Sequence, residues 1–166
     1  MSGHTTFQPG LLRNKAALIT GGGSGINRQI ALTYALAGAA VTIVGRSAEK
    51  ACDVAAEIEA SGGTALGLSA DVRSYDSVQD AVEKAYSTFG PIDIVIAGAA
   101  GNFVAPVTSM SSNGFRAVIE TDLVGTFNTL RAAHQFLRKP EWDQNNCYPI
   151  ITPDAQRCEN GRPVDR

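Results

Sequence analysis

Residues 20–27 read TGGGSGIN, and the chain on either side of them gives this stretch its meaning. Before it, residues 16–20 (AALIT) are short, apolar and partly β-branched, which is typical of a strand buried on both faces of a parallel sheet. After it, apolar residues recur at helical spacing from Ile26 to Ala37, and Gly38 is suited to end that helix in a left-handed conformation. The pattern predicts a strand, a glycine turn and a helix in immediate succession.

A strand that runs through glycines into a helix is suited to bind a nucleotide diphosphate. Small residues admit phosphates to the backbone, and the first turn of the helix offers unpaired N–H groups. Gly21 and Gly25 are therefore candidate phosphate-approach positions. Glycine runs also occur in ordinary flexible turns, and it is the flanking strand and helix that favour the nucleotide site. Asn27 stands where the motif has a third glycine, so its amide either reaches a phosphate or ribose or is simply tolerated there.

The composition limits the class of protein. The chain has 166 residues, 44% of them hydrophobic and 18% charged, which is long enough for one domain with a core. A net charge of −2 gives no electrostatic reason to expect nucleic acid or an anionic membrane as partner. No apolar run reaches about 18 residues, and the N-terminus lacks the pattern of a signal peptide. The three cysteines, which form no C-x-x-C pair, argue against a disulfide scaffold or a metal site, and we expect a cytoplasmic protein.

Strand and helix patterns alternate along the chain. Further buried strands are predicted at residues 41–44, 64–69 and 92–97, helices at 48–60 and 74–89, and a long helix at 111–137 that is interrupted near Gly125 and Thr126. This alternation predicts an α/β fold with a doubly wound parallel sheet and right-handed crossovers. We divide the chain into a lead-in (1–15), a nucleotide-binding domain (16–140) and an irregular tail (141–166).

Two turns of the predicted sheet indicate what binds there. About 20 residues beyond the glycines, where an acidic residue would hold the ribose of NAD, the chain has Arg46 and Ser47, which favour the 2′-phosphate of NADP(H). The alternative is a solvated surface arginine. Residues 98–103 (GAAGNF) follow the fourth strand, at the edge where ligands bind; their small residues let a cofactor lie close, while Asn102 and Phe103 face a substrate. The alternative there is a loop kept small for packing.

From residue 12 to residue 139 the chain resembles the short-chain dehydrogenase/reductase family. Residues 20–26 (TGGGSGI) are similar to its T-G-x-x-x-G-[IL] fingerprint, and residues 98–101 stand where the family usually has N-N-A-G. Asp71 and Val72 resemble its adenine-contacting pair. Residues 99–103 (AAGNF) and 125–128 (GTFN) are similar to stretches of the 2,4-dienoyl-CoA reductase branch.

The resemblance implies a Rossmann-like fold that binds NADP(H) and transfers hydride to an unsaturated acyl thioester or carbonyl substrate. The cofactor-binding residues it implies are Gly21, Ser24, Gly25, Ile26, Arg46, Ser47, Asp71, Val72, Ala99, Ala100 and Gly101. It places Asn102 and Phe103 near the substrate. Asp122 occupies the position where most of the family has an asparagine that supports a proton relay, and an aspartate there is compatible with the dienoyl-CoA reductase branch.

The chain departs from the family in lacking the catalytic tyrosine and lysine that follow the first half of the family's sheet. The family uses a tyrosine as acid/base and a lysine that lowers the tyrosine pKa, usually as Tyr-x-x-x-Lys. None of the tyrosines has a lysine four residues later, and no lysine follows Lys139. A catalytically silent nucleotide-binding or interaction module is therefore the alternative function.

Residues 141–166 have neither helical nor strand periodicity, and only Ile150 and Ile151 suggest a fifth strand. We hypothesise that this tail is out of frame and that the reductase is truncated after about four strands. The rivals are a natural short protein with its own ending and a paralogue that lost catalysis. In each case the fourth strand and the long helix would leave apolar surface uncovered, so we expect a marginal fold or self-association into a homo-oligomer through that face.

Overall fold

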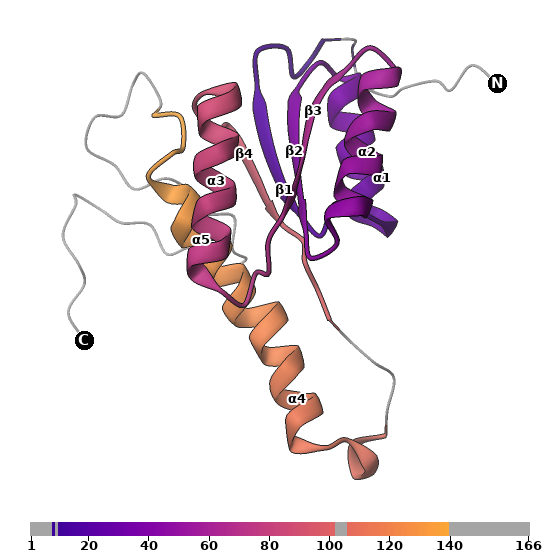
Figure 1. Ribbon diagram of the computed structural model, residues 1–166, viewed down its shortest axis with the longest axis vertical. Coiled ribbons are helices and arrows are strands. Elements are labelled where there is room, and N and C mark those ends of the chain that lie inside the picture. The colour runs from indigo at the N-terminus through magenta and orange to yellow at the C-terminus, as the bar shows by residue number, and fades with distance from the viewer. Residues whose placement is uncertain (1–7, 9, 102–105, 140–166) are drawn as a thin grey trace.

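The computed structural model describes residues 8, 10–101 and 106–139, and these form an α/β fold (Figure 1). One parallel sheet has the strand order β3-β2-β1-β4, where the strands are β1 (Ala16–Thr20), β2 (Ala40–Gly45), β3 (Thr64–Ser69) and β4 (Ile94–Ala97). The helices that cover it are α1 (Gly25–Leu36), α2 (Ala48–Ala60), α3 (Tyr75–Phe89) and α5 (Gly125–His134). The predicted Rossmann-like, doubly wound parallel sheet is confirmed.

Helices cover both faces of the sheet, with α1 and α2 on one side and α3 and α5 on the other (Figure 1). Successive strand residues point to opposite faces. Leu18 therefore packs in the core beneath α3 and α5, while Ile19 packs in the core beneath α1 and α2. All five residues of β1 are buried, because β1 lies between β2 and β4 and has helices on both faces. This explains why its sequence is apolar throughout and does not alternate.

Most element boundaries lie where the sequence predicts them, and the exceptions are the start of β4 and the end of the long helix, which stops at His134 and not at residue 137. The helix α2 and the strand β3 span the predicted residues, and Ser74 caps α3 by accepting a hydrogen bond from the Ser77 N–H. The strand β4 begins at Ile94, two residues later than predicted. Ile92 instead pairs with Leu137 in an isolated parallel bridge, so the segment after α5 lies beside the start of β4.

The long helix is interrupted, as predicted, but by a π-helical turn that precedes Gly125. It consists of α4 (Ser112–Ile119), the π turn (Glu120–Val124) and α5. Gly125 itself is needed for packing, because a Cβ there would come within 2.6 Å of Val72 Cγ2. The glycine thus lets the helix approach the loop after β3.

Asp93 connects three parts of the fold. Its side chain is only 7% exposed and pairs with Lys15 Nζ at 2.9 Å and Arg138 Nε at 2.7 Å. The backbone N–H of Ala16 donates to the same carboxylate at 2.9 Å. Burial raises the pKa of Asp93, but the hydrogen bonds from Arg138, Ala16 and Lys15 outweigh it, so the pKa lies below its ordinary value. The start of β1, the start of β4 and the chain after α5 are held together by this ionised carboxylate.

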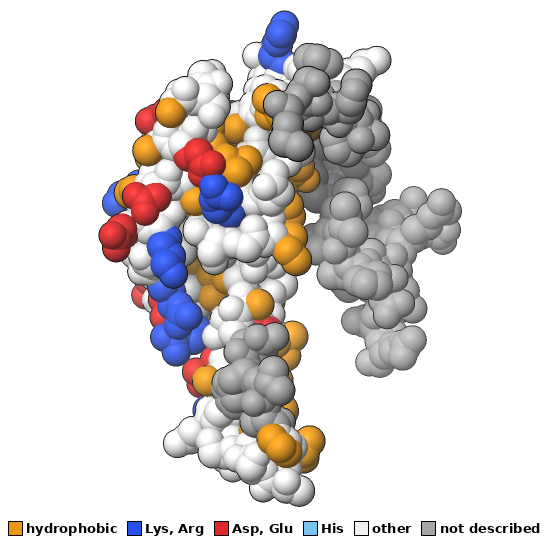
Figure 2. Space-filling view, turned by 90° about the vertical axis from the view of Figure 1, so that its right-hand side faces the viewer, with side chains coloured by type: hydrophobic (Ala, Val, Ile, Leu, Met, Phe, Trp, Pro, Cys, Tyr) orange, Lys and Arg blue, Asp and Glu red, His pale blue; other side chains and the backbone are white. Residues whose placement is uncertain are grey.

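An apolar stripe lies exposed along α4, the π turn and α5. It consists of Phe115, Ile119, Leu123 and Phe127, which are spaced four residues apart and so lie along one side of the helix. Figure 2 shows hydrophobic side chains also at the lower end of the molecule, over the turn at Val107–Ser109 and α4. The prediction that the long helix leaves apolar surface uncovered is confirmed. None of the helices in the described ranges combines the length and the apolar character needed to cross a membrane.

Candidate functional site

A cavity of about 1000 Å³ opens at the carboxyl end of the sheet. Its lining comes from the segments that follow all four strands, at residues 21 and 23–27, 45–47, 70–72 and 98–100, together with Lys50 and Thr121. Because the carboxyl ends of parallel strands meet at one edge, residues far apart in sequence face one cavity. The structure thereby brings together all of the predicted cofactor residues except Gly101, which is next to the lining residue Ala100.

The N-terminus of α1 has the properties of an anion site. Gly25 opens the helix with φ +58°, and a Cβ placed on it would have no atom within 4 Å. Ser24 is the N-cap residue but makes no side-chain capping bond, and the first turn contains no acidic residue. The positive end of the helix is therefore not neutralised from within the helix, and there is room beside it for a phosphate. The Ile26 side chain, 81% exposed, lies at the edge of this cavity.

Gly21 is closely packed against the backbone of the loop after β4. Its φ is +71°, and a Cβ would lie 2.8 Å from the Gly98 carbonyl oxygen and 2.8 Å from Ala99 Cα. The turn after β1 and the loop after β4 therefore touch backbone to backbone at this glycine. The close approach explains why Gly21 has to be glycine even before any phosphate is considered.

Asn27 has a role that neither sequence interpretation included. Its Nδ2 donates to the Gly98 carbonyl oxygen at 2.6 Å. A Cβ on Gly98 would lie 2.5 Å from that same amide nitrogen, so the two residues are complementary in size. Asn27 thus connects α1 to the loop after β4. Sequence reasoning missed the contact because its partner is 71 positions away.

Besides Asn27, two further side chains fix the loop that carries Ala99, Ala100 and Gly101. Thr20 Oγ1 accepts hydrogen bonds from the backbone N–H groups of Gly98 at 3.1 Å and Ala99 at 3.3 Å. Asp122, in the π turn, accepts from the Gly101 N–H at 2.8 Å. The extra residue of a π turn changes the direction in which neighbouring side chains point, which is a common feature of functional sites. Asp122 therefore orders the loop, and its part in a proton relay stays a prediction.

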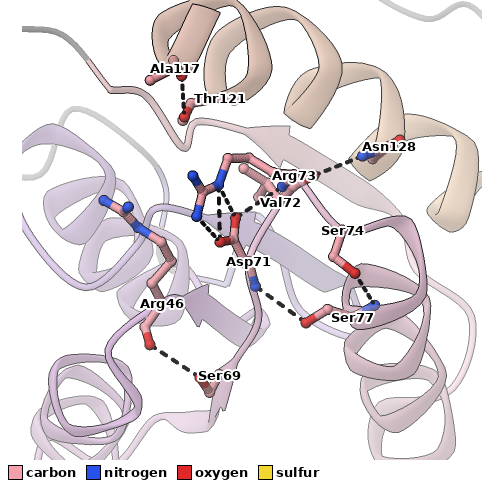
Figure 3. A network of polar contacts seen from close by, with 10 residues as sticks. All are labelled: Arg46, Ser69, Asp71, Val72, Arg73, Ser74, Ser77, Ala117, Thr121 and Asn128. Carbon is pink, nitrogen blue, oxygen red and sulfur yellow. Dashed lines mark hydrogen bonds and ion pairs between the residues drawn. The ribbon is translucent and has the colours of Figure 1, made fainter. Parts of the chain in front are cut away.

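Positive charge is concentrated after β2. Arg46, Ser47 and Lys50 all line the cavity, and within the described part of the chain Arg46 forms no ion pair. Ser47 caps α2 by accepting from the Lys50 N–H at 3.3 Å, which leaves its hydroxyl hydrogen available to a ligand. Figure 3 shows Arg46 beside the end of β3, where the Arg46 carbonyl oxygen accepts a hydrogen bond from Ser69 Oγ at 3.2 Å. Lys50 was not predicted, because nothing in its own stretch of helix marks it.

Asp71 is paired with Arg73, a residue that the sequence analysis did not select. Arg73 Nε lies 3.0 Å from each carboxylate oxygen, and Nη2 and the backbone N–H of Arg73 also donate to the carboxylate (Figure 3). The side-chain bonds from Arg73 lower the pKa of Asp71 although burial opposes them, and the charge of Arg46 lowers it further. The Asp-x-Arg spacing, which permits this local turn, is the signal that could have identified Arg73.

The backbone beside Asp71 is held by α5. Asn128 is buried, and its Nδ2 donates to the Val72 carbonyl oxygen at 2.9 Å (Figure 3). The Val72 side chain is buried against Gly125. The loop after β3 and the loop after β4 are thus both fixed by the long helix, through Asn128 in α5 and Asp122 in the π turn.

No tyrosine of the described residues lines the cavity. Tyr75 lies beneath the Arg131 guanidinium at 4.8 Å, and the ring of Tyr86 lies 5.1 Å from that of Phe136. Tyr34 packs against the core beneath α1 and α2. Tyr148 and the predicted substrate residues Asn102 and Phe103 lie outside the described residues, as does the tail from 141 to 166. In the described ranges no three His, Cys, Asp or Glu side chains are grouped to hold a metal ion.

The chain is similar in sequence to known short-chain dehydrogenases. A family model described as short chain dehydrogenase matches residues 15–144. The peroxisomal 2,4-dienoyl-CoA reductase of Arabidopsis thaliana is 41% identical over 133 residues, which cover 80% of this chain and 45% of that protein. The mouse (Mus musculus) protein of the same name is 45% identical over 126 residues, covering 75% and 43%. The chain therefore spans less than half the length of these two relatives.

The solved structures agree with the sequence comparison. A citronellol catabolism dehydrogenase from Pseudomonas aeruginosa superimposes with a TM-score of 0.75 at 35% sequence identity. The match covers 80% of this chain and 54% of that one.

Proposed function

Because this chain belongs to the short-chain dehydrogenase family, we propose that it binds NADP(H) at the carboxyl end of its sheet and acts as an oxidoreductase. The observation that carries the proposal is the N-terminus of α1. Gly25 leaves open space there, the Ser24 hydroxyl makes no cap, and no acidic side chain neutralises the first turn. A pyrophosphate fits this chemistry, because its oxygens would accept hydrogen bonds from the unpaired N–H groups of the helix and from the Ser24 hydroxyl.

The other ligand contacts follow from the position of each loop around the cavity. Arg46 and Ser47 would bind the 2′-phosphate, with Lys50 as a further cation nearby. Asp71 and Val72 would contact the adenine, and residues 99–101 would border the nicotinamide. When bound, the reduced nicotinamide supplies a hydride. The task of this chain is to orient it with a loop that Thr20, Asn27 and Asp122 already hold in place.

For the substrate we propose an unsaturated acyl thioester, with Asn102 and Phe103 at its binding site. Support comes from the names of the Arabidopsis and mouse relatives and from the AAGNF stretch at residues 99–103. Hydride addition to a conjugated carbon also requires a proton. Among the described residues no tyrosine lines the cavity to deliver it, and a second function therefore has to be considered.

The second candidate is a nucleotide-binding module without catalysis, which the absence of a tyrosine from the cavity lining among the described residues favours. Binding and turnover separate the two. We expect NADPH to enhance and shift its fluorescence on titration with the full chain, and a dienoyl-CoA to be reduced only if the chain is an enzyme. Binding without turnover would establish the module, and the absence of any binding would reject both candidates.

The choice of NADPH over NADH is tested by Arg46→Ala. We expect this change to lower the preference for NADPH about tenfold, because a charge-assisted bond to the 2′-phosphate contributes about 1.5–3 kcal/mol. Affinities for NADPH and NADH from fluorescence titration give the preference. Arg28→Ala is the matched control, since Arg28 pairs with Glu57 on the α1–α2 surface and lies outside the cavity lining. Equal losses for both nucleotides in Arg46→Ala would contradict recognition of the 2′-phosphate by this residue.

The compartment is proposed from composition alone. The cysteine pattern favours the cytoplasm. The Arabidopsis and mouse relatives are named as peroxisomal proteins. Imaging the chain as a fluorescent fusion, together with a separate peroxisomal marker, would decide between the cytoplasm and the peroxisome.

A further inference from the structure

We propose that Arg73 is a positioning residue, which holds the Asp71 carboxylate in one orientation so that it selects a purine base carrying an exocyclic amine. This inference rests on the proposed nucleotide site. Asp71 lines the cavity, whereas Arg73 is not among the residues that line it. Because Arg73 bonds to the Asp71 carboxylate and is outside the lining, it acts on a ligand through Asp71.

The geometry of the pair restricts the carboxylate strongly. Arg73 Nε donates to both oxygens at 3.0 Å, Nη2 donates to Oδ2, and the Arg73 backbone N–H donates to Oδ1 at 3.0 Å. A planar guanidinium that contacts both oxygens fixes the plane of the carboxylate as well as its position. A single point charge at the same place would fix only the distance.

The backbone that carries the pair is fixed independently. Ala70 N–H donates to the Gly45 carbonyl oxygen at 3.0 Å, and the Asp71 N–H donates to Ser77 Oγ at 3.3 Å. On the other side, the Val72 carbonyl oxygen accepts from Asn128 at 2.9 Å. With the main chain held at these three points, the remaining freedom of Asp71 is rotation of its own side chain. Arg73 removes that freedom.

A fixed carboxylate has a defined preference among bases. An ionised carboxylate only accepts hydrogen bonds, and its two oxygens offer about four lone-pair sites. Arg73 occupies about three of them, because its backbone N–H, Nε–H and Nη2–H donate and the single Nε–H is shared between the two oxygens. About one site therefore remains for a donor in the cavity. The exocyclic amine of adenine donates, whereas the carbonyl oxygen that replaces it in hypoxanthine would face the carboxylate with like partial charge. A carboxylate free to rotate could turn away from that oxygen, and the preference would fall.

The size of the effect is limited by solvent. The Asp71 side chain is 32% exposed and that of Arg73 is 43% exposed, so water can partly replace a lost bond. We therefore expect the wild-type chain to bind NADPH about tenfold more tightly than its hypoxanthine analogue, at the lower end of what a hydrogen bond to a charged group contributes.

The test measures the ratio of dissociation constants for NADPH and the hypoxanthine analogue, by fluorescence titration of the full chain. In Arg73→Ala we expect the ratio to fall from about ten to about two or less. Arg73→Lys keeps the charge but not the planar fork, and its ratio should lie between those of wild type and Arg73→Ala. Arg28→Ala removes a similar arginine–carboxylate pair on the α1–α2 surface and should leave the ratio unchanged.

The outcomes separate this inference from the proposed function. If Arg73→Ala weakens both nucleotides equally and keeps the ratio, Arg73 contacts a phosphate or only stabilises the loop, and the inference is wrong while the nucleotide site stands. If the wild-type chain binds neither nucleotide, both are wrong. If Arg73→Ala does not fold, as judged by circular dichroism, the ratio in Arg73→Lys decides, and a value equal to wild type would overturn the inference.

Discussion

Gly21 and Gly25 share a left-handed backbone but have opposite surroundings. Both have positive φ, and a side chain costs about 1–2 kcal/mol in that conformation. Around Gly21 the backbone of the loop after β4 fills the space that a Cβ would occupy, whereas around Gly25 that space is empty. The first glycine therefore serves the fold, and the second leaves room for a ligand.

This contrast gives a matched pair of substitutions. Gly21→Ala should lower the free energy of unfolding by about 2–5 kcal/mol, because overpacking against backbone adds about 1–3 kcal/mol to the conformational cost. Gly25→Ala should lower it by only about 1–2 kcal/mol and should weaken NADPH binding. Urea denaturation measures the first quantity and fluorescence titration the second. Equal destabilisation by the two substitutions would contradict the packing role of Gly21.

Among the elements, the long helix of α4, the π turn and α5 fixes two of the loops around the cavity. Asn128 fixes the loop after β3, and Asp122 in the π turn fixes the loop after β4. The turn precedes Gly125, where the helix comes within close contact of Val72. A helix that is remote from the glycine motif in sequence thus sets the positions of the residues proposed for adenine and nicotinamide.

The junction of β1, β4 and the chain after α5 depends on the ionisation of Asp93. Its pKa in the folded protein is lowered, so its stabilising contribution is present above the ordinary aspartate pKa of about 4 and is lost as the pH falls through the lower folded value. We expect Asp93→Asn to lower the free energy of unfolding by about 1.5–3 kcal/mol at neutral pH. The difference from wild type should shrink as the pH is lowered below about 4.

Urea denaturation at a series of pH values measures this difference. Asp71 also has a lowered pKa and titrates in the same acidic range, so the comparison with Asp93→Asn isolates the contribution of Asp93. A stability difference that does not change between neutral and acidic pH would show that the Asp93 contacts do not depend on its charge.

At the scale of the whole molecule, the exposed stripe of Phe115, Ile119, Leu123 and Phe127 is the surface most suited to association. We expect the chain to form homo-oligomers through it, because large exposed apolar surface is removed from water when two copies meet. Replacing Leu123 and Phe127 with glutamine should shift the protein to smaller species at equal concentration. Light scattering after size-exclusion chromatography measures this shift.

The control for this prediction is Leu36→Gln, which changes a leucine that is exposed on α1, away from the stripe. It should leave the molar mass unchanged. A wild-type chain that remains a monomer at micromolar concentration and unfolds in one sharp thermal transition would contradict association through the stripe.

The sequence by itself determined the order of the elements and the chemistry of the cavity edge. A buried strand is recognised as a short apolar run, a helix by apolar residues at helical spacing, and a turn by its glycines. Each of these patterns depends only on residues that are close together in the sequence. The positions of β3 and α2 and the grouping of Gly25, Arg46 and Asp71 at one cavity follow from such local patterns once the strands are parallel.

Only the tertiary structure decided which groups hold that cavity in shape. Asn27 bonds to Gly98, Asp122 to Gly101, and Asn128 to Val72, and each pair joins residues that are 21 to 71 positions apart. The start of β4 was also decided this way, since Ile92 pairs with Leu137. Such contacts depend on how helices pack across the sheet edge, and no local periodicity encodes that packing.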